Sequence, residues 1–334
     1  MSASPKTAAT GLPDASELQL DANGRLRHLL TLKGLSRVGL TELLDLAESY
    51  LSPLHQPVIR SSALRGRTVA NLFFEPSTRT RASFELAAKR LGADVLNLDV
   101  NMSSRKKGES VLDTIYSLQA MQIDVFVVRD AGAGVTSFIA RHVHDHVSVL
   151  NGGEAHISHP TQGLLDLLTM RQAKGRFEDL KVVIVGDIAH SRVARSAAEG
   201  LNTLAVGELC LVSPDAFAPS PADFPGATLT NDLDAAMRGA DVVMALRIQR
   251  ERIGSYEGIP SIDEYYARFG VTHERMKRAA KGAIVMHPGP MNRGIEIESS
   301  LADGPQSRIT RQVTNGVAVR MAVLASVMAA REQR

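Results

Sequence analysis

Short apolar runs alternate with stretches of helical periodicity along most of the chain. The clearest unit is the apolar run 69–74, which is followed by Pro76 and by apolar positions at helical spacing as far as Leu91. Similar apolar runs predict strands at 95–98, 124–129, 147–151, 181–186, 208–212, 241–246 and 283–286. Helical patterns lie at 40–51, 108–121, 164–173, 190–201, 232–238 and 312–331. This alternation predicts an α/β fold with two doubly wound, mostly parallel sheets.

The same pattern divides the chain into four segments. Residues 1–28 contain few large apolar side chains and are expected to form a flexible tail. Residues 29–160 and 161–308 each contain one set of strands and helices, and we expect them to form two domains linked by helices. The apolar helix within 309–334 precedes no further strand, so we expect it to pack back on the first domain.

The junction between the first strand and its helix is rich in groups that bind anions. Three hydroxyls and two guanidiniums follow one another from Ser77 to Arg81. At a helix start, free backbone N–H groups and the positive end of the helix dipole favour an anion. Arginine adds charge-assisted hydrogen bonds worth about 1.5–3 kcal/mol each. A well-capped helix with solvated arginines is the alternative, but one hydroxyl suffices for a cap. We therefore interpret this segment as a phosphate-binding cradle.

Polar side chains also follow several of the other predicted strands. Arg129 ends the strand 124–129, and His159 and Gln162 stand at the start of the helix 164–173. Ligand groups in open α/β sheets gather at such carboxyl ends. A lone histidine is more often structural than catalytic, and from the residues alone both readings of His159 stay open. The segment 151–154 is expected to be a turn, and the basic loop 101–109 is, from charge alone, a solvated surface turn.

Composition and charge argue against several classes of protein. A net charge of +2 and an aromatic content of 4% give no support for nucleic-acid binding. We expect no membrane association, because no run approaches the roughly 18 apolar residues of a membrane span. The single cysteine, Cys210, and the absence of a visible signal peptide favour a reducing cytoplasm. The alternating histidines 142, 144 and 146 are interpreted as a surface run, since no second cluster completes a metal site.

Four motifs resemble the aspartate/ornithine carbamoyltransferase family. In chain order they are Ser77-Thr78-Arg79-Thr80-Arg81, His159-Pro160-x-Gln162, Arg247-x-Gln249 and His287-Pro288-Gly289-Pro290. The resemblance implies that 29–160 binds carbamoyl phosphate and that 161–308 binds the amino acid. It also implies a homotrimer with active sites shared between subunits, and no cofactor or metal. The aspartate-using members are the nearer match, because the His-Cys-Leu-Pro element and Ser-Met-Gly loop typical of ornithine-using members are absent.

The resemblance further implies a role for each motif residue. Ser77, Thr78, Arg79 and Thr80 would hold the phosphate, with Glu75 orienting the arginines of the cradle. Arg129 would bridge phosphate and carbonyl oxygen, and His159 and Thr80 would donate to that oxygen. Gln162 and the backbone carbonyl of Pro290 would hold the carbamoyl NH2, with Gly289 nearby. Ser103 and Lys107 would reach into the neighbouring subunit's site. Arg192 would take the α-carboxylate of aspartate, and Arg247 and Gln249 the β-carboxylate.

The implied reaction is carbamoyl transfer from carbamoyl phosphate to L-aspartate, a step of de novo pyrimidine (UMP) biosynthesis. Its implied catalytic residues are Arg79, Thr80, Arg129, His159 and Lys107. Two alternatives stay open, namely ornithine carbamoyltransferase and a non-catalytic family member that acts as an assembly or allosteric subunit. Association with regulatory or dihydroorotase-like chains is a further expectation for some members of the family. A dinucleotide enzyme fits less well, since Gly132-Ala133-Gly134 lacks the third glycine and the acidic residue of that fingerprint.

Overall fold

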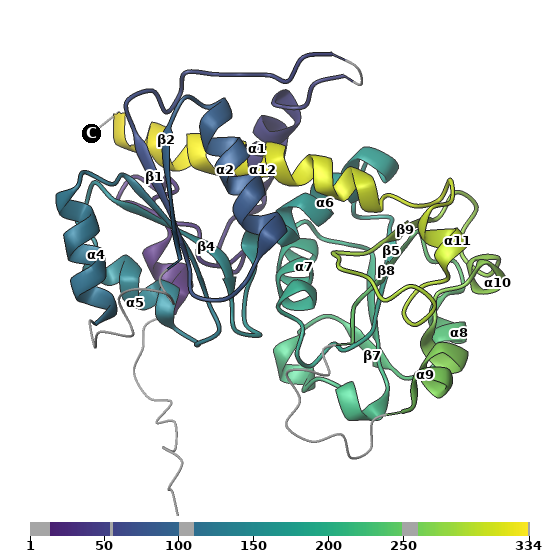
Figure 1. Ribbon diagram of the computed structural model, residues 1–334. Coiled ribbons are helices and arrows are strands. Elements are labelled where there is room, and N and C mark those ends of the chain that lie inside the picture. Colours follow the sequence, from purple (N-terminus) through teal and green to yellow (C-terminus); the bar gives the residue numbers. More distant parts are fainter. Residues whose placement is uncertain (1–13, 54–55, 100–109, 249–259, 333–334) are drawn as a thin grey trace, which may run out of the picture.

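Parallel strands form two separate sheets in a computed structural model that describes residues 14–53, 56–99, 110–248 and 260–332 (Figure 1). The first sheet has the order β2-β1-β3-β4 and the second the order β7-β6-β5-β8-β9. The strands of the first sheet are β1 (Thr68–Phe73), β2 (Asp94–Asp99), β3 (Val125–Asp130) and β4 (Ser148–Glu154). Those of the second are β5 (Lys181–Val185), β6 (Glu208–Val212), β7 (Thr228–Thr230), β8 (Val242–Ala245) and β9 (Ile284–Met286). All pairings between them are parallel, so the predicted pair of parallel-sheet α/β domains is confirmed.

Helices connect the strands and cover both faces of each sheet (Figure 1). Those of the first half are α1 (Arg37–Ser49), α2 (Thr78–Arg90), α4 (Val111–Ala120), α5 (Val135–His142) and α6 (Pro160–Lys174). Those that follow are α7 (Arg192–Thr203), α8 (Leu233–Ala236), α9 (Ile262–Phe269), α10 (His273–Met276), α11 (Ser299–Ala302) and α12 (Ile309–Glu332). Short 3-10 segments lie at Ala15–Leu18, Asp215–Phe217 and Pro221–Asp223.

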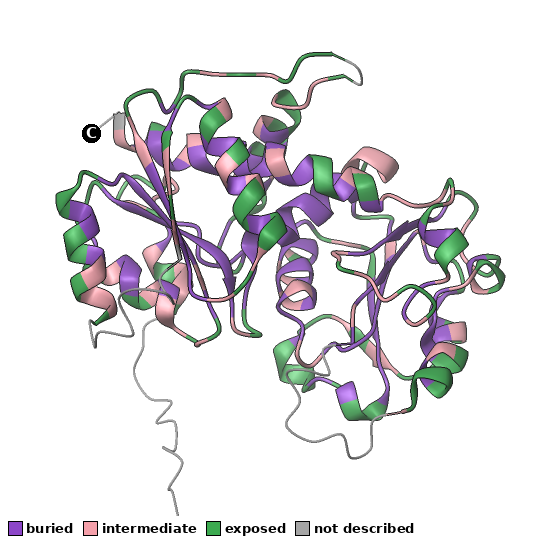
Figure 2. Cartoon of the chain, viewed as in Figure 1, coloured by how far each residue is buried: buried purple, intermediate pink, exposed green. Residues whose placement is uncertain are grey.

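Alternation along the strands divides the apolar side chains between the two faces of each sheet. On β1, Val69 and Phe73 belong to one buried cluster, and Ala70 and Leu72 to another that includes Ile115 of α4. The first cluster continues through α1, α2, α6, α7 and α12 into one face of the second sheet. The two domains therefore share a continuous apolar core, which Figure 2 shows as buried ribbon running through both.

Helix α12 joins the two halves of the molecule. It packs on α1 and α2 of the first domain and on α6, so the expected return of the C-terminal helix is confirmed (Figure 1). Ile309–Arg331 is long and apolar enough to cross a membrane by composition, but 72% of its apolar window is buried inside the fold. This burial is typical of the core helix of a globular protein.

The expectation of a flexible tail over 1–28 is wrong for residues 14–28. Gln19 is completely buried there, and its Oε1 accepts hydrogen bonds of 2.9 Å from the backbone N–H groups of Leu30 and Thr31. Its Nε2 donates to the carbonyl of Lys33. One side-chain amide thus pairs three backbone groups of the following segment and anchors 14–28 on the domain. The sparse apolar composition hid this, because a polar group makes the attachment.

The predicted turn at 151–154 is also wrong, since these residues complete β4. The pairing of β3 with β4 shifts register between Val128 and Asp130, where β4 contains two glycines. Gly153 has a φ of 121°, a backbone conformation that L side chains rarely adopt. Glycine here marks an irregular strand rather than its end.

Candidate active site

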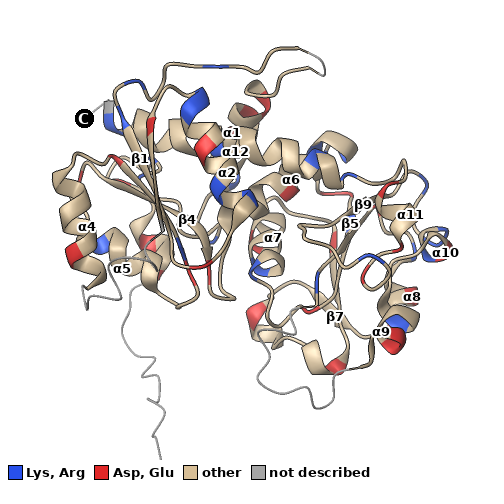
Figure 3. Ribbon diagram, in the orientation of Figure 1, with Lys and Arg blue, Asp and Glu red and all other residues tan. Residues whose placement is uncertain are grey.

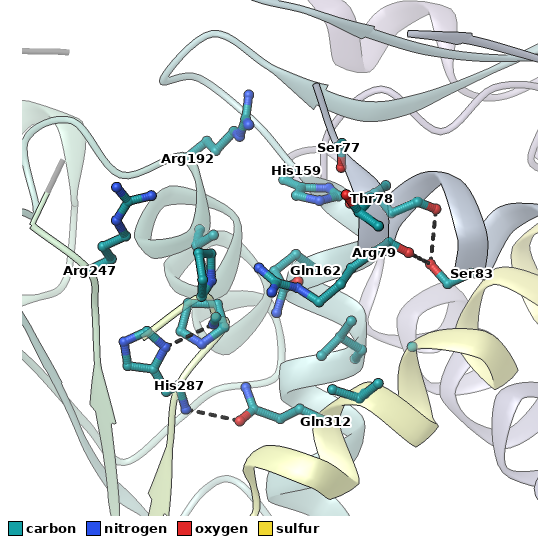
Figure 4. A pocket seen from close by; sticks show the side chains of 18 of the residues that line it. Ser77, Thr78, Arg79, Ser83, His159, Gln162, Arg192, Arg247, His287 and Gln312 are labelled. Atoms are coloured by element: carbon teal, nitrogen blue, oxygen red, sulfur yellow. Dashed lines mark hydrogen bonds between the residues drawn. The ribbon is translucent and has the colours of Figure 1, made fainter. Parts of the chain in front are cut away.

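The carboxyl ends of the central strands in both sheets face a single cavity of about 830 Å³ (Figure 4). From the first domain, Ser77 follows β1, Arg129 lies near the end of β3, and His159 follows β4. From the second domain, Arg192 begins α7 after β5, and Arg247 follows β8. The predicted site residues that line the cavity are Ser77, Thr78, Arg79, Thr80, Arg129, His159, Gln162, Arg192, Arg247, Gly289 and Pro290. The structure thus brings together every predicted site residue that it describes, whereas Ser103, Lys107 and Gln249 lie outside the described residues.

The cradle opens helix α2 without a side-chain cap. Ser77 occupies the N-cap position, but its hydroxyl makes no capping hydrogen bond. The hydroxyl of Ser83, one turn further on, donates to the backbone carbonyls of Arg79 and Thr80 at 2.7 and 2.9 Å. Arg79 lines the cavity, whereas Arg81 is exposed and does not. The cradle therefore contains one guanidinium rather than the two expected, together with an N-cap hydroxyl that the helix does not use.

Glu75 connects the two domains at the cavity wall. Its Oε1 lies 2.6 Å from a guanidinium nitrogen of Arg129 and 2.8 Å from one of Arg192. The side chains of both arginines are almost completely buried, with 11% and 6% of their surfaces exposed. We expected Glu75 to orient the arginines of the cradle, but within the described residues its ion pairs are with Arg129 and Arg192 instead. One carboxylate thus fixes an arginine from each domain.

Gly153 leaves the space that the same two arginines occupy. A Cβ at this position would lie 2.7 Å from Nη1 of Arg129 and 3.2 Å from Cζ of Arg192. Arg129 in turn donates to the carbonyl of Gly152 at 3.2 Å, and Arg192 donates to the carbonyl of Ala155 at 3.1 Å. The backbone at the irregular end of β4 therefore packs against both guanidiniums. Sequence reasoning missed this role, because the contacts come from distant parts of the chain.

Substitution of Gly153 by alanine is expected to lower kcat/KM about 10–10²-fold, because a methyl group would displace both guanidiniums and small misplacements cost this much. Steady-state kinetics measures the loss. Gly175→Ala is the matched control, since Gly175 also has a positive φ, of 85°, but no atom lies within 4 Å of its added Cβ. The control should lose about 1–3 kcal/mol of stability through backbone strain and remain within about twofold of wild-type activity. Equal losses in both variants would show that backbone strain, not contact with the arginines, is responsible.

Two histidines in the cavity wall are neutral. His159 is 5% exposed, and burial together with Arg129, Arg192 and Arg320 lowers its pKa well below the usual range. Burial and the charge of Arg79 lower the pKa of His287 to about 4. The Nδ1 atom of His287 accepts the backbone N–H of Gly289 at 2.8 Å, which places its proton on Nε2. At neutral pH both imidazoles can donate a hydrogen bond but add no charge to the site.

Positive charge dominates the described lining of the cavity. Its arginines are Arg79, Arg129, Arg192, Arg247 and Arg320, and its only acidic residue there is Glu75. Elsewhere Lys and Arg are interspersed with Asp and Glu over both domains (Figure 3). No cluster of three or more His, Cys, Asp or Glu side chains that could hold a metal ion occurs in the described part of the chain. The arrangement fits a ligand, or a pair of ligands, with several negative charges.

Two charged residues that sequence reasoning did not select lie at the cavity or directly behind its lining. Arg320 of α12 lines the cavity and is 3% exposed, and Asp166 of α6 is completely buried. Arg320 interrupts the otherwise apolar run 317–324, and Asp166 interrupts the run 164–168. A charged residue within a buried helix needs a partner or a function, so these interruptions were the signal that could have identified them.

Two parallel α/β domains with an arginine-rich cavity between their strand ends define a class of two-domain proteins that hold anionic ligands at the domain interface. Residues 27–172 match the family described as aspartate/ornithine carbamoyltransferase, carbamoyl-P binding domain. Residues 178–327 match the Asp/Orn binding domain of the same family. The chain belongs to the aspartate/ornithine carbamoyltransferase family.

Solved structures of both branches of this family resemble the chain. Aspartate transcarbamoylase from Trypanosoma cruzi in complex with N-(phosphonacetyl)-L-aspartic acid is 30% identical, with a TM-score of 0.81 over 94% of this chain and 99% of that one. The same enzyme in complex with carbamoyl phosphate and aspartate is 29% identical, with a TM-score of 0.80 over 95% and 99%. Ornithine carbamoyltransferase from Thermus thermophilus is 27% identical, with a TM-score of 0.79 over 90% and 99%. Similarity therefore supports a carbamoyltransferase without selecting the amino acid.

Proposed function

We propose that this chain is the catalytic chain of an aspartate carbamoyltransferase. It transfers the carbamoyl group of carbamoyl phosphate to the amino group of L-aspartate and gives N-carbamoyl-L-aspartate and phosphate. Membership of the family supports carbamoyl transfer. The Trypanosoma cruzi relatives, which were solved with carbamoyl phosphate and aspartate bound, support this pair of substrates.

The charge of the second domain's wall is the observation that favours aspartate over ornithine. Arg192 and Arg247 face the cavity from this domain, and none of its described residues adds a carboxylate to the lining. Aspartate brings two carboxylates, each of which a guanidinium can bind in a bidentate manner. Ornithine brings a second ammonium group, which two arginines would repel. The wall therefore suits a dicarboxylic amino acid.

Each wall of the cavity then has its own task. The cradle holds the phosphate group through Ser77, Thr78, Arg79 and Thr80. Arg129, His159 and Thr80 stabilise the carbonyl oxygen, while Gln162 and the loop containing Gly289 and Pro290 hold the carbamoyl NH2. Arg192 binds the α-carboxylate of aspartate, and Arg247 and Gln249 bind the β-carboxylate.

The reaction needs no nucleophile from the protein. The uncharged amino group of aspartate attacks the carbamoyl carbon, so that a C–N bond forms and negative charge grows on the carbonyl oxygen. The C–O bond to phosphate then breaks, and one N–H proton is released. Arg129 and the neutral His159 stabilise the oxyanion, and Arg79 stabilises the departing phosphate. Catalysis rests on positioning and electrostatic stabilisation.

Phosphate release from carbamoyl phosphate, measured with aspartate and with ornithine in parallel, tests this proposal. We expect turnover with aspartate and at least about 10²-fold lower kcat/KM with ornithine, because the second ammonium would be left among arginines. Preference for ornithine would identify the other branch of the family. Turnover with neither amino acid, in a chain that binds carbamoyl phosphate, would favour a non-catalytic subunit.

The assembly and setting of the enzyme are further parts of the proposal. Ser103 and Lys107 complete the site of a neighbouring subunit in a homotrimer, as the resemblance to the family implies. The product N-carbamoyl-L-aspartate serves de novo pyrimidine (UMP) biosynthesis in the cytoplasm. Regulatory or dihydroorotase-like chains are candidate partners for a larger assembly.

A further inference from the structure

Asp166 is a completely buried carboxylate that lies one helical turn after Gln162 on α6. Its Oδ1 accepts a hydrogen bond of 3.0 Å from Nε2 of Gln162 and one of 2.7 Å from Nε2 of Gln312 on α12. The Oε1 of Gln312 in turn accepts the backbone N–H of His287 at 2.9 Å. Gln162, Gln312 and His287 line the cavity, whereas Asp166 stands behind it. A buried series of hydrogen bonds thus runs behind the site and connects α6, α12 and the end of β9. Figure 4 shows its bond between His287 and Gln312.

The backbone N–H of His287 decides which group donates and which accepts in each hydrogen bond of this series. The backbone N–H of His287 can only donate, so Gln312 must present its oxygen to it. The NH2 group of Gln312 then points to Asp166, whose Oδ1 must accept. Gln162 meets the same oxygen and must also present its NH2 group. Its Oε1 is therefore the acceptor that this carboxamide offers to a ligand, and the second N–H of its NH2 group remains a donor.

The alternative orientation of Gln162 would place two acceptors against each other. Burial raises the pKa of Asp166 to about 7, and the hydrogen bonds from the two glutamines oppose this shift. When the carboxyl group is protonated, the proton can sit on Oδ2, because this atom is buried and has no hydrogen-bond partner. Oδ1 consequently accepts from both amides in either protonation state. The charge of Arg320 also opposes the rise in the pKa of Asp166, but among the described residues Asp166 forms no ion pair, and the amides of Gln162 and Gln312 are its hydrogen-bond partners.

We propose that Asp166 is a positioning residue that holds the Gln162 carboxamide with its oxygen toward the ligand, and that it thereby makes the site selective for an acyl phosphate whose acyl group carries an N–H donor. This inference rests on the proposed function. It adds a structural reason why the site selects a carbamoyl donor. The NH2 group of carbamoyl phosphate can donate to Oε1 of Gln162. The methyl group of acetyl phosphate has a similar size but would cover this oxygen without giving it a hydrogen-bond partner, which is costly.

The binding of two stable analogues tests this preference without requiring catalytic turnover. Phosphonoacetamide and acetonylphosphonate share the phosphonate and carbonyl groups and differ only in NH2 against CH3. Isothermal titration calorimetry of the wild-type protein is expected to show about tenfold or greater preference for the amide, the value of one buried hydrogen bond. A wild-type protein with no preference would overturn the inference. Loss of the carbamoyl transfer reaction with this preference intact would overturn only the proposed function.

Three variants of Asp166 test whether this residue causes the preference. Asp166→Leu removes the acceptor with the same number of side-chain heavy atoms and should reduce the preference by more than about threefold, the remainder coming from the loop that contains Gly289 and Pro290. Asp166→Asn keeps one oxygen for both amides and should stay within about threefold of the wild-type preference. Asp166→Ser is measured alongside as a second variant without the carboxylate, so that the test still stands if the leucine variant does not fold. The serine oxygen lies one bond nearer the backbone than Oδ1 and is withdrawn from the two amides, so it should also weaken the preference.

Inorganic phosphate is the control ligand, since it occupies the cradle without touching Gln162. Its Kd should stay within about threefold of wild type in all folded variants, because Asp166 makes no contact with Ser77–Arg81. Unchanged amide preference in the leucine and serine variants would contradict the positioning role. Equal weakening of both analogues and of phosphate would show that Asp166 has only a structural role.

Discussion

Replacing Arg79 by alanine is expected to lower kcat for carbamoyl transfer by about 10²–10³-fold, the usual cost of removing one donor to developing charge. Arg79 is the guanidinium of the cradle and stands at the N-terminus of α2, where the free N–H groups and the helix dipole act on the same anion. Negative charge moves onto the leaving phosphate as the C–O bond breaks, so the contact is stronger in the transition state than before it. The loss should therefore fall mainly on kcat rather than on KM.

Arg81→Ala is the matched control for this substitution. Arg81 lies on the same first turns of α2 but is exposed and outside the cavity, so its loss should leave kcat within about twofold. Steady-state phosphate release with both substrates provides the comparison. A kcat for Arg79→Ala within a few-fold of wild type would mean that the cradle does not bind the leaving group.

Replacing Glu75 by glutamine is expected to lower kcat/KM for aspartate by about 10²-fold. The carboxylate lies between Arg129 and Arg192, each at 2.8 Å or less, and a charge-assisted hydrogen bond contributes about 1.5–3 kcal/mol. Both guanidiniums contact the same Oε1, so glutamine can keep an oxygen there, but it removes the negative charge that strengthens both hydrogen bonds. Arg192 would then no longer be held for the amino acid, and Arg129 would no longer be held for the carbonyl oxygen.

Glu85→Gln on α2 is the control, because the ion pair of Glu85 with Lys89 connects two surface residues one helical turn apart. Exposed pairs of this kind contribute little, so activity should change by less than about twofold. Kinetics at several aspartate concentrations distinguishes a rise in KM from a fall in kcat. Wild-type kinetics in the Glu75 variant would mean that the arginines keep their positions without the carboxylate.

Local sequence patterns predicted the elements of the fold and the position of the cradle at a helix start. The apolar run before Pro76 and the helical spacing after Ser77 are each decided within a few residues, so the strand, the helix and the anion-binding start could be read directly. The gathering of Arg129, His159 and Gln162 near the cradle also followed, once the strands were taken to be parallel. The roles of Arg192 and Arg247 came from the resemblance to the family.

The remaining features depend on contacts between distant parts of the chain. Glu75 and Arg192 are separated by 117 positions, and no local pattern links them. Gly153 resembled a turn residue, because its role is set by guanidiniums that lie far from it in the sequence. Gln19 was taken for part of a flexible segment, because a single amide rather than an apolar face attaches it. Such features are properties of tertiary packing and become visible only in three dimensions.

The path of α12 determines how the two domains can move. The chain leaves the first domain after α6 and returns to it through α12, so the second domain is an insertion within the first (Figure 1). Two covalent connections, rather than one, therefore cross the boundary. A body held by two connections can swing about the line between them but cannot twist freely. A change in the width of the cavity would therefore follow a hinge-like path that carries Arg192 and Arg247 toward or away from the cradle.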